Sequence, residues 1–420
     1  MRQKSVKKAE TGPRNWRKTA VFMLAAIVVS YLAAVNSLAN IARRKNPEIA
    51  LMVSREEPVA LTTKADREFQ ATQTPSALTG VERQARRALR QQAHNAAAIR
   101  LLGYVADVRG NSQEAQRFVN MSSRVSRRDF GTQIWLIEQA AQKEQLAKAL
   151  LHYDIALRTT IESRSILFPT LINALASEDV RRAFTPYVSN APTWMLDFIP
   201  QAIAEIENPS DIVSIMMAAN NSATIPEYKN FPNLLLSQLE SKRKFSDYRR
   251  YYLSLPESEP RLLSSVDINK SSILNRYSSI GWQSFNGAAV GSSFSATAQK
   301  SGFHLQAYAR PNTSGLVARK LLFLGAGNYV LSARYDATSA GLDADLTWQI
   351  QCLSHPGNTV FTVTNIPIAA GKFYTLNRFA MPSDCSAQYL NLFVTDGNSQ
   401  SGMDISMERL KLITVSAASL

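Results

Sequence analysis

The chain has 420 residues, of which 45% are hydrophobic and 19% charged, a composition typical of folded proteins and not of disordered ones. Its 17 glycines and 17 prolines are close to average usage and exclude collagen-like and low-complexity classes. The formal net charge is +14, but residues 281–420 contain nine basic against seven acidic residues. The basic excess therefore lies in the first two-thirds of the chain, and we expect no nucleic-acid partner for the whole protein.

The N-terminal segment combines positive charge with a long apolar run. Seven basic residues precede the run, and Arg43, Arg44 and Lys45 follow it. From Ala20 to Ala42 the segment is long enough for a helix that crosses a membrane, which needs about 20 residues. We predict a basic cytoplasmic tail at residues 1–18 and a transmembrane signal anchor at residues 19–42.

The alternative is a cleaved signal peptide, because Ser37-Leu38-Ala39 has small residues at the two positions that a signal peptidase reads. The excess of positive charge before the run places the N-terminus in the cytoplasm. We therefore predict a single-pass protein of the bacterial inner membrane, with the bulk of the chain in the periplasm. Both alternatives export the rest of the chain.

The middle of the chain is predicted to be helical, with a juxtamembrane linker at residues 43–75 and a helical-repeat domain at residues 76–256. Residues recur there at a spacing of 34. The spacing relates Leu102 to Leu136 in the first helix of each pair. In the second helices it relates Ala115, Ala149 and Ala183, and four residues later Val119, Tyr153 and Tyr187.

These residues, together with Gly103 and Gly110, resemble the tetratricopeptide repeat family. The resemblance implies an α-solenoid of helical hairpins that binds a protein partner. The sequence departs from the family pattern where Gly103 gives way to Ile137 and Leu171, and Pro169 and Pro186 predict interruptions of the third pair. An unrelated helical bundle with coincidental spacing is the alternative.

Basic residues gather on the first predicted repeat. Arg83, Arg86, Arg87 and Arg90 lie within two helical turns, and Arg100, Arg109, Arg117, Arg124, Arg127 and Arg128 follow. This cluster predicts either a solvated basic face or a face for an anionic partner. In "SKRKFSDYRRYY", residues 241–252, basic and aromatic residues alternate, a pattern typical of a packed helix face with its long cationic side chains reaching solvent.

The final third is predicted to be a β-sandwich at residues 269–420, joined by a linker at residues 257–268. Runs such as "FHLQAYAR", "YVLSARY", "LTWQIQCL", "YLNLFVT" and "MERLKLITV" alternate with period two and are separated by turn-forming residues. About eight short strands predict an antiparallel sandwich. The whole chain is thus multidomain, α then β.

The sequence contains two cysteines, Cys352 and Cys385. We predict that they form a disulfide, since export supplies an oxidising compartment. Two free buried thiols are the alternative.

The segments "GNYVLSARYDA", "LTWQIQC" and "GMDISMERLKLI" resemble jelly-roll sandwiches of the galactose-binding and carbohydrate-binding-module type. Such domains often bind glycans, although many only mediate contacts. In "FHLQAYARP" the polar residues His304, Gln306, Tyr308 and Arg310 are predicted on one strand face, a residue set suited to a sugar. The alternative is an ordinary exposed sandwich face.

No motif predicts catalysis. The four histidines, His94, His152, His304 and His355, lack metal-ligand spacing, and neither a phosphate-binding loop nor a nucleophile elbow is present. We predict no metal, no cofactor and no enzymatic activity. The sequence favours a non-enzymatic, membrane-anchored periplasmic scaffold or adaptor in cell-envelope biogenesis, with a link to polysaccharide assembly or export. The alternative function is glycan binding through the C-terminal sandwich.

Overall fold

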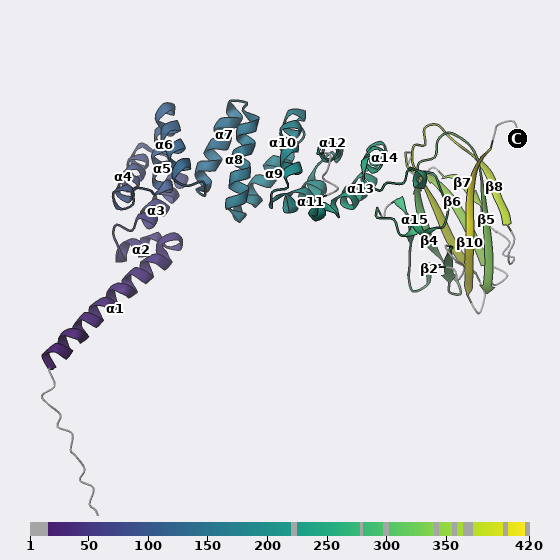
Figure 1. The fold of residues 1–420 in the computed structure, drawn as a ribbon, viewed down its shortest axis with the longest axis horizontal. Coiled ribbons are helices and arrows are strands. Elements are labelled where there is room, and N and C mark those ends of the chain that lie inside the picture. The colour runs from purple at the N-terminus through teal and green to yellow at the C-terminus, as the bar shows by residue number, and fades with distance from the viewer. Residues whose placement is uncertain are drawn as a thin grey trace, which may run out of the picture. The chain divides into compact units, whose positions relative to one another are not determined.

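A computed structural model describes residues 16–219, 225–277, 280–296, 302–339, 344–354, 359–363, 373–397 and 402–415. Helices make up the first part of the chain and strands the last part (Figure 1). The chain divides into two compact units, residues 1–167 and 168–420. This division lies inside the predicted helical-repeat domain, so the helices that follow Leu167 share a compact unit with the sandwich.

The first helix, α1 (Trp16–Lys45), is long and apolar enough to cross a membrane. Its large apolar side chains, among them Phe22, Leu24 and Ile27, are exposed, because no other described part of the protein packs on them. A signal sequence near an N-terminus has the same length and composition, so both interpretations of this segment stay open. Residues 1–15 of the predicted basic tail lie outside the described residues.

The first unit continues with α2 (Pro47–Val53), α3 (Pro58–Ala71), α4 (Pro75–Gln91), α5 (Ala96–Val108), α6 (Ser112–Val125), α7 (Phe130–Gln142), α8 (Leu146–Thr159) and a 3-10 turn, η1 (Ile161–Ser163). Consecutive helices pack on each other, α3 on α4, α5 on α6 and α7 on α8. Side chains of Thr74, Asn95, Asn111 and Asp129 accept a backbone N–H at the start of four of these helices.

The segment predicted as a juxtamembrane linker, residues 43–75, is folded into α2 and α3. Ala60, Leu61 and Ala65 of α3 are buried, and α3 packs on α4. Pro58 and Pro75 look like helix breakers in the sequence, but each occupies the first position of a helix, where proline is well tolerated. The prolines therefore start helices here and do not separate a linker from a domain.

The boundary between the units lies inside α9 (Arg164–Ala174). The second unit continues with α10 (Glu178–Asn190), α11 (Met195–Glu205), α12 (Ser210–Ala218), η3 (Pro226–Tyr228), α13 (Phe231–Ser241), α14 (Phe245–Ser254), η4 (Pro260–Leu263) and α15 (Lys270–Ile273). Rings of Phe168, Phe184, Trp194 and Phe198 form an aromatic cluster with centroids 5.2–6.3 Å apart. Pro169 and Pro186, predicted to interrupt helices, lie inside α9 and α10.

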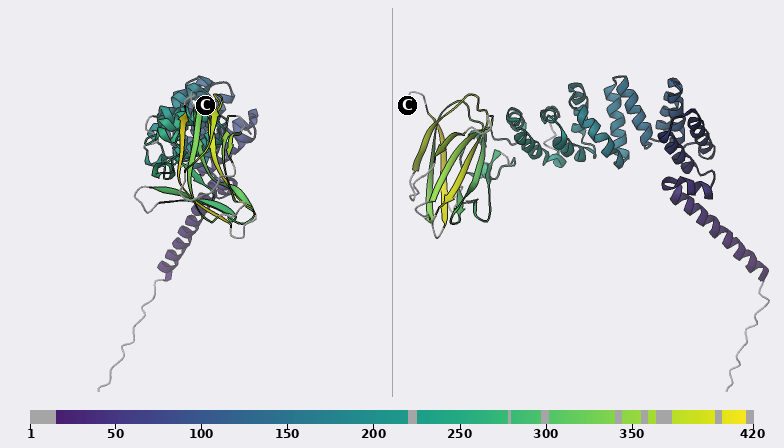
Figure 2. Two further views of the ribbon diagram at one scale, coloured as in Figure 1. Left: turned by 90° about the vertical axis from the view of Figure 1, so that its right-hand side faces the viewer. Right: turned by 180° about the vertical axis from the view of Figure 1, so that it is seen from behind.

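The C-terminal part is an antiparallel β-sandwich of two five-stranded sheets, seen from two further directions in Figure 2. We call the sheet with strand order β1-β4-β9-β6-β7 the first sheet and the sheet with order β2-β3-β10-β5-β8 the second sheet. The strands are β1 (Trp282–Ser284), β2 (Val290–Ala296), β3 (Phe303–Ala309), β4 (Thr313–Leu322), β5 (Gly327–Ser339), β6 (Ala344–Cys352), β7 (Thr359–Val363), β8 (Phe373–Met381), β9 (Gln388–Asp396) and β10 (Met403–Val415).

Alternating residues of the strands supply the sandwich core. On β6, Leu346, Trp348, Ile350 and Cys352 are buried, as their period-two spacing predicts. The Trp348 indole N–H donates to the Tyr335 hydroxyl on β5 at 2.6 Å, which satisfies the one polar atom of the indole. The predicted linker, residues 257–268, adds Val266 and Ile268 to this core. The segment is therefore packed against the sandwich.

Candidate functional site

The predicted polar face of β3 is exposed on the second sheet. Leu305, Ala307 and Ala309 point into the core. The alternate residues His304, Gln306 and Tyr308 therefore lie on the outer face, where Gln306 is exposed and the other two are half-buried. Arg310 follows the end of the strand and is exposed. Three of the four predicted residues thus lie on one strand face, and the fourth lies beside it.

The Tyr308 ring lies across the neighbouring strand β2. A Cβ atom added to Gly291 would stand 2.8 Å from the Tyr308 hydroxyl oxygen and 2.9 Å from ring atom Cζ. The hydroxyl donates toward Asn286 Oδ1 at 2.8 Å and the Gly287 carbonyl at 2.6 Å. Glycine at 291 and these two acceptors thus hold the ring against the outer face of the sheet.

Other polar groups lie on the same strands and on β10 beside them. The Ser295 hydroxyl on β2 donates to Gln306 Oε1 at 3.2 Å. On the other side of β3, Ser406 and Asp404 of β10 stand opposite Gln306 and Tyr308. An aromatic ring with amide, hydroxyl and carboxylate groups on the same sheet face can bind a ligand that has both apolar faces and hydroxyls. We call the surface formed by His304, Gln306, Tyr308 and Gly291 the Tyr308 face.

The outer face of the first sheet also carries an aromatic ring, amides and a cation, but here these groups contact one another. Arg319 Nε donates to Asn391 Oδ1 at 2.9 Å, and the guanidinium lies 4.3 Å from the centroid of the Tyr389 ring. Asn391 in turn donates to Gln349 at 3.4 Å and is only 1% exposed. The Tyr389 hydroxyl bonds Glu240 on α13, and burial raises the pKa of that carboxyl group. These polar groups are bonded to one another and to a helix.

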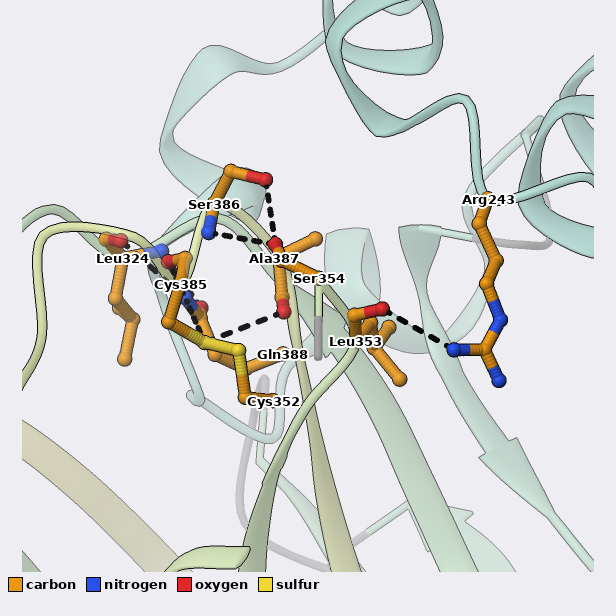
Figure 3. The surroundings of a disulfide bond; sticks show 9 residues. All are labelled: Arg243, Leu324, Cys352, Leu353, Ser354, Cys385, Ser386, Ala387 and Gln388. Atoms are coloured by element: carbon orange, nitrogen blue, oxygen red, sulfur yellow. Dashed lines mark hydrogen bonds between the residues drawn. A yellow bond between two sulfur atoms is a disulfide. The ribbon is translucent and has the colours of Figure 1, made fainter. Parts of the chain in front are cut away.

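The structure contains the predicted disulfide between Cys352 and Cys385, with the Cα atoms 5.7 Å apart (Figure 3). It joins the end of β6 to the segment before β9. The Leu353 N–H donates to the Ala387 carbonyl at 2.9 Å, which adds a backbone link beside the covalent one. The alternative of two free thiols is thereby excluded.

Lys320 on β4 is a buried cation in the second unit. It is 0% exposed, and its ammonium donates to the Ile280 carbonyl at 2.8 Å. Burial lowers the pKa of Lys320 to about 7, against the opposing influence of the Asp267 charge. No sequence signal marks this residue, because it follows Arg319 in an ordinary basic pair.

The repeat positions of the first unit show one close helix crossing. A Cβ atom on Gly103 would stand 2.8 Å from Val119 Cγ2 and 3.3 Å from the Ala115 carbonyl oxygen, so α5 and α6 approach closely at this glycine. Leu102, Leu136 and Ala149 are buried, and Tyr153 is half-buried.

The third repeat unit does not keep this pattern. On α10 the buried residues are Phe184 and Val188, one position after the predicted Ala183 and Tyr187, which are half-buried. The spacing of 34 thus predicts the buried residues of α6 and some of those of α8, but it does not predict the buried residues of α10. The solenoid arrangement and the membership of the tetratricopeptide family stay predictions.

Acidic residues partly neutralise the predicted basic face on α4. Arg86 pairs with Glu82 at 2.9 Å, and Arg87 lies 3.7 Å from Glu56. Arg83 and Arg90 are both exposed on the same helix. The sequence could not show the pairing of Arg87, since its partner Glu56 lies in the turn between α2 and α3.

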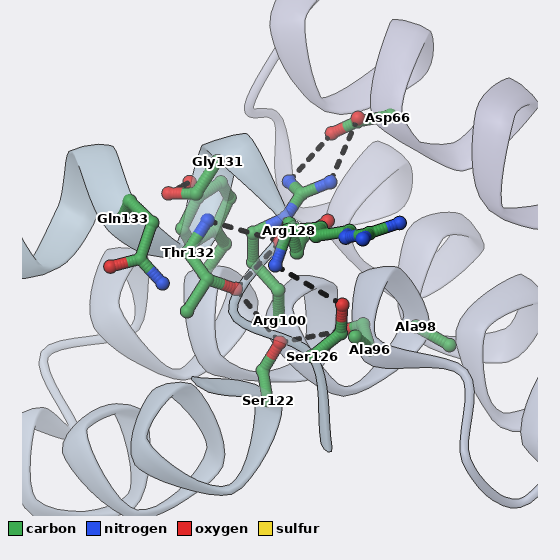
Figure 4. A network of polar contacts seen from close by, with 12 residues as sticks. Asp66, Ala96, Ala98, Arg100, Ser122, Ser126, Arg128, Gly131, Thr132 and Gln133 are labelled. Atoms are coloured by element: carbon green, nitrogen blue, oxygen red, sulfur yellow. Dashed lines mark hydrogen bonds and ion pairs between the residues drawn. The ribbon is translucent and has the colours of Figure 1, made fainter. Parts of the chain in front are cut away.

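Arg100, counted above among the basic surface residues, is instead only 5% exposed at the centre of a polar network (Figure 4). Its guanidinium donates to both oxygens of Asp66, at 2.9 and 3.0 Å, and to Asp129 Oδ2 at 2.7 Å. Burial lowers the pKa of Arg100, but the two carboxylates outweigh it, and the pKa is raised overall. A Cβ atom on Gly131 would stand 2.7 Å from Arg100 Nε, so this network also requires that glycine.

A polar hollow of about 360 Å³ lies between α6, α7 and α8 in the first unit. The His152 ring at its edge contacts Gln133 Oε1 through Nδ1 at 2.9 Å, and burial lowers the pKa of His152. The other polar residues that line the hollow are Gln116, Asn120, Gln139, Lys143, Gln145 and Lys148.

Among the described residues, no three His, Cys, Asp or Glu side chains lie together in a way that could hold a metal ion. Of the four histidines, His355 lies outside the described residues.

No family model and no curated protein matches this sequence. Among solved structures, the chain is similar to the carbohydrate-binding module TmCBM61 in complex with β-1,4-galactotriose, with 10% identity, 32% of this chain and 88% of that chain covered, and a TM-score of 0.24. It is also similar to the enzymatically active domain of tailspike protein 4 of bacteriophage CBA120, with 15% identity, 32% of this chain covered and a TM-score of 0.20. The chain spans 19% of the length of that second protein.

Proposed function

We propose that this protein is a membrane-anchored binding protein whose C-terminal sandwich binds carbohydrate through the Tyr308 face. The observation that carries this proposal is the hydroxyl end of the Tyr308 ring held over Gly291 on the outer face of the second sheet. A glycine inside a strand costs about 0.5–1 kcal/mol relative to alanine. At 291 it leaves room for a ring that stays half-exposed.

The chemistry of a sugar matches this face. A pyranose ring has an apolar face of C–H groups and a rim of hydroxyls. The apolar face would stack on the Tyr308 ring, and the hydroxyls would bond Gln306 and the polar groups of β10 beside it. The outer face of the first sheet fits less well, because Arg319, Asn391 and Gln349 bond one another.

We also propose where in the cell the protein is located. The exposed apolar surface of α1 and the Cys352–Cys385 bond both support a chain that is anchored in the bacterial inner membrane and extends into the periplasm. We propose that the N-terminus is cytoplasmic, from the charge asymmetry around the span. We also propose a role in cell-envelope biogenesis, without enzymatic activity and without a nucleic-acid partner.

A binding measurement on the detergent-solubilised full chain tests the carbohydrate proposal. We would screen an array of neutral oligosaccharides that includes β-1,4-galactotriose, and then measure the best ligand by calorimetry. Tyr308→Ala should weaken binding at least tenfold, equivalent to about 1.4 kcal/mol. Gly291→Ala should have a similar effect with the tyrosine present, because the added Cβ displaces the ring. Phe393→Ala, on the outer face of the first sheet, is the control and should bind as the parent does. Absence of binding to every sugar, or equal loss in the control, would reject the proposal.

A scaffold role for the helices is a second candidate, favoured by the polar hollow between α6, α7 and α8. Its amide side chains, Gln116, Asn120 and Gln139, can bond the backbone of an extended peptide. A photo-crosslinking residue at Gln139 should capture one specific envelope protein in native membranes, and the same residue at exposed Arg90 should not. Capture of the same proteins from both positions would contradict this role.

A further inference from the structure

We infer that a basic cleft between α14 and the sandwich binds an acidic polysaccharide through its carboxylate groups. This site lies on different residues from the Tyr308 face and does not depend on it. Two adjoining hollows of about 370 and 400 Å³ form the cleft, and they share Phe245, Ser246 and Ser386.

Cations dominate the lining of the cleft. It carries Arg243, Lys244, Arg249 and Arg250 against a single carboxylate, Asp247. Asp247 pairs with Arg250 at 2.7 Å, which neutralises one of the four. Lys244 and Arg249 are both exposed along the cleft. These two cations are therefore available to an anion, and their field raises its local concentration.

The sequence pattern "SKRKFSDYRRYY" has a clear structural outcome here. Its aromatic residues, Phe245, Tyr248, Tyr251 and Tyr252, are buried, and Tyr248 stacks on Phe323 of the sandwich with centroids 5.5 Å apart. The basic residues between them consequently point outward along the cleft. The expected packed face is present, and four of its exposed cations line one hollow surface.

The disulfide positions neutral hydrogen-bonding groups on the opposite wall. Ser354 lies two residues after Cys352, and Ser386 directly follows Cys385. Their hydroxyl oxygens are 2.8 Å apart, and the Ser386 N–H donates to Ser354 Oγ at 3.0 Å. Arg243 reaches the same wall and donates to the Leu353 carbonyl at 3.5 Å (Figure 3). Serine hydroxyls lie opposite the cations across the cleft. The cations can bind the carboxylate of an acidic sugar, and the serines can bond its hydroxyls.

The size of the cleft favours a chain of sugars over a single small ion. Each hollow alone falls within the usual range for small-ligand sites, roughly 300–1,000 Å³. Cations line both of them, Arg249 and Arg250 in one and Arg243 and Lys244 in the other. Two successive acidic residues of a polysaccharide would place one carboxylate in each.

Polygalacturonate as the acidic probe and β-1,4-galactan as the neutral probe test this inference on the detergent-solubilised full chain. The double variant Lys244→Gln/Arg249→Gln should bind polygalacturonate at least tenfold more weakly than the parent and bind galactan unchanged. The binding of the parent should weaken with added salt, and that of the variant less so. Both side chains are exposed, so the variant should fold as the parent does.

Two control variants separate the cleft from the rest of the protein surface. Arg83→Gln/Arg90→Gln removes the same charge from α4 and should leave polygalacturonate binding unchanged. Tyr308→Ala should also leave it unchanged, so a failure of the carbohydrate proposal above would not affect this one. Equal loss in any control variant, or no loss in the cleft variant, would overturn the inference. Binding of soluble dihexanoyl phosphatidylglycerol at these residues without binding of polygalacturonate would also overturn it, in favour of a lipid.

Discussion

Arg100 in the first unit and Lys320 in the second are both buried cations, but their surroundings differ. Arg100 has two carboxylates, Asp66 and Asp129, and its pKa is raised. Lys320 has a backbone carbonyl, and its pKa is lowered to about 7. The comparison shows that burial alone does not decide the charge state of a side chain. The presence of a bonded counter-charge does.

The two cations consequently serve stability in different ways. The Arg100 guanidinium joins α3, α5 and the start of α7 by charge-assisted hydrogen bonds, so the packing of these helices depends on its charge. The Lys320 ammonium donates to a neutral carbonyl, and folding at a pH below its pKa therefore buries a charge without a bonded counter-charge.

The largest expected effect comes from removing the compensated cation. Arg100→Met leaves Asp66 and Asp129 without their common partner and should destabilise the first unit by about 3–5 kcal/mol. Pulse proteolysis of the full chain, with mass-spectrometric assignment of the fragments, would follow each unit separately. Arg90→Met on the exposed side of α4 is the control and should change stability by less than about 0.5 kcal/mol. If the two variants behaved alike, Arg100 would be no more than a surface residue.

Nothing local in the sequence distinguishes Arg100 from the arginines around it. Its partner Asp66 lies 34 residues earlier, in a segment predicted as a linker, and Asp129 lies 29 residues later. Charge counting therefore assigned Arg100 to a basic surface. Only the packing of α3 against the following helices brings the three charges together, and such packing is not written in the local pattern.

In the sandwich, local periodicity was more informative. The runs that alternate with period two correspond to β3, β5, β6, β9 and β10. The strands β4 and β2 were not predicted, because their residues alternate less regularly between apolar and polar. On β4, Lys320, Leu321 and Leu322 are buried in succession, and a register shift between Leu316 and Ala318 breaks the alternation. β2 contains Gly291 and three serines, so few apolar side chains mark the face of the strand that points into the core.

The second prediction concerns the uncompensated cation. Between pH 7 and the unfolded pKa of Lys320 near 10.5, the unfolded chain holds a proton that the folded protein lacks. The second unit should therefore become more stable as pH rises above about 7, by up to about 1.4 kcal/mol per pH unit. Lys320→Met should lack this slope and exceed the parent in stability below pH 7.

The same pulse proteolysis at pH 6, 7, 8 and 9 would measure that slope. Buried tyrosines such as Tyr335 set the upper limit of the useful pH range. Burial raises the pKa of Tyr335, so at higher pH the unfolded chain loses that proton first and the stability of the fold decreases. Stability of the parent that did not change between pH 7 and 9, or a matching slope in Lys320→Met, would show that Lys320 carries its charge in the fold. The contrast with Arg100 would then disappear.

The candidate sites were predictable in part. Alternation located His304, Gln306 and Tyr308 on one face, because side-chain direction in a strand follows directly from residue number. Gly291 was missed, although a glycine inside a strand marks a close approach of other groups. The basic cleft was also missed, since its walls come from α14 and from the segments next to two cysteines 33 positions apart.

The smallest expected effect tests how tightly the Arg100 network is built. A Cβ atom on Gly131 would meet Arg100 at 2.7 Å, so Gly131→Ala should displace the guanidinium and cost about 1–3 kcal/mol in the first unit. Gly80→Ala is the matched control. There the added Cβ meets the flexible carboxylate of Glu68 at 2.8 Å, and α4 gains a better helix former, worth up to about 1 kcal/mol. Hydrogen exchange of α5 and α7 peptides in the full chain should therefore accelerate in Gly131→Ala and not in Gly80→Ala. Unchanged exchange in Gly131→Ala would mean that the network relaxes around a methyl group, and that charge pairing alone holds Arg100 in place.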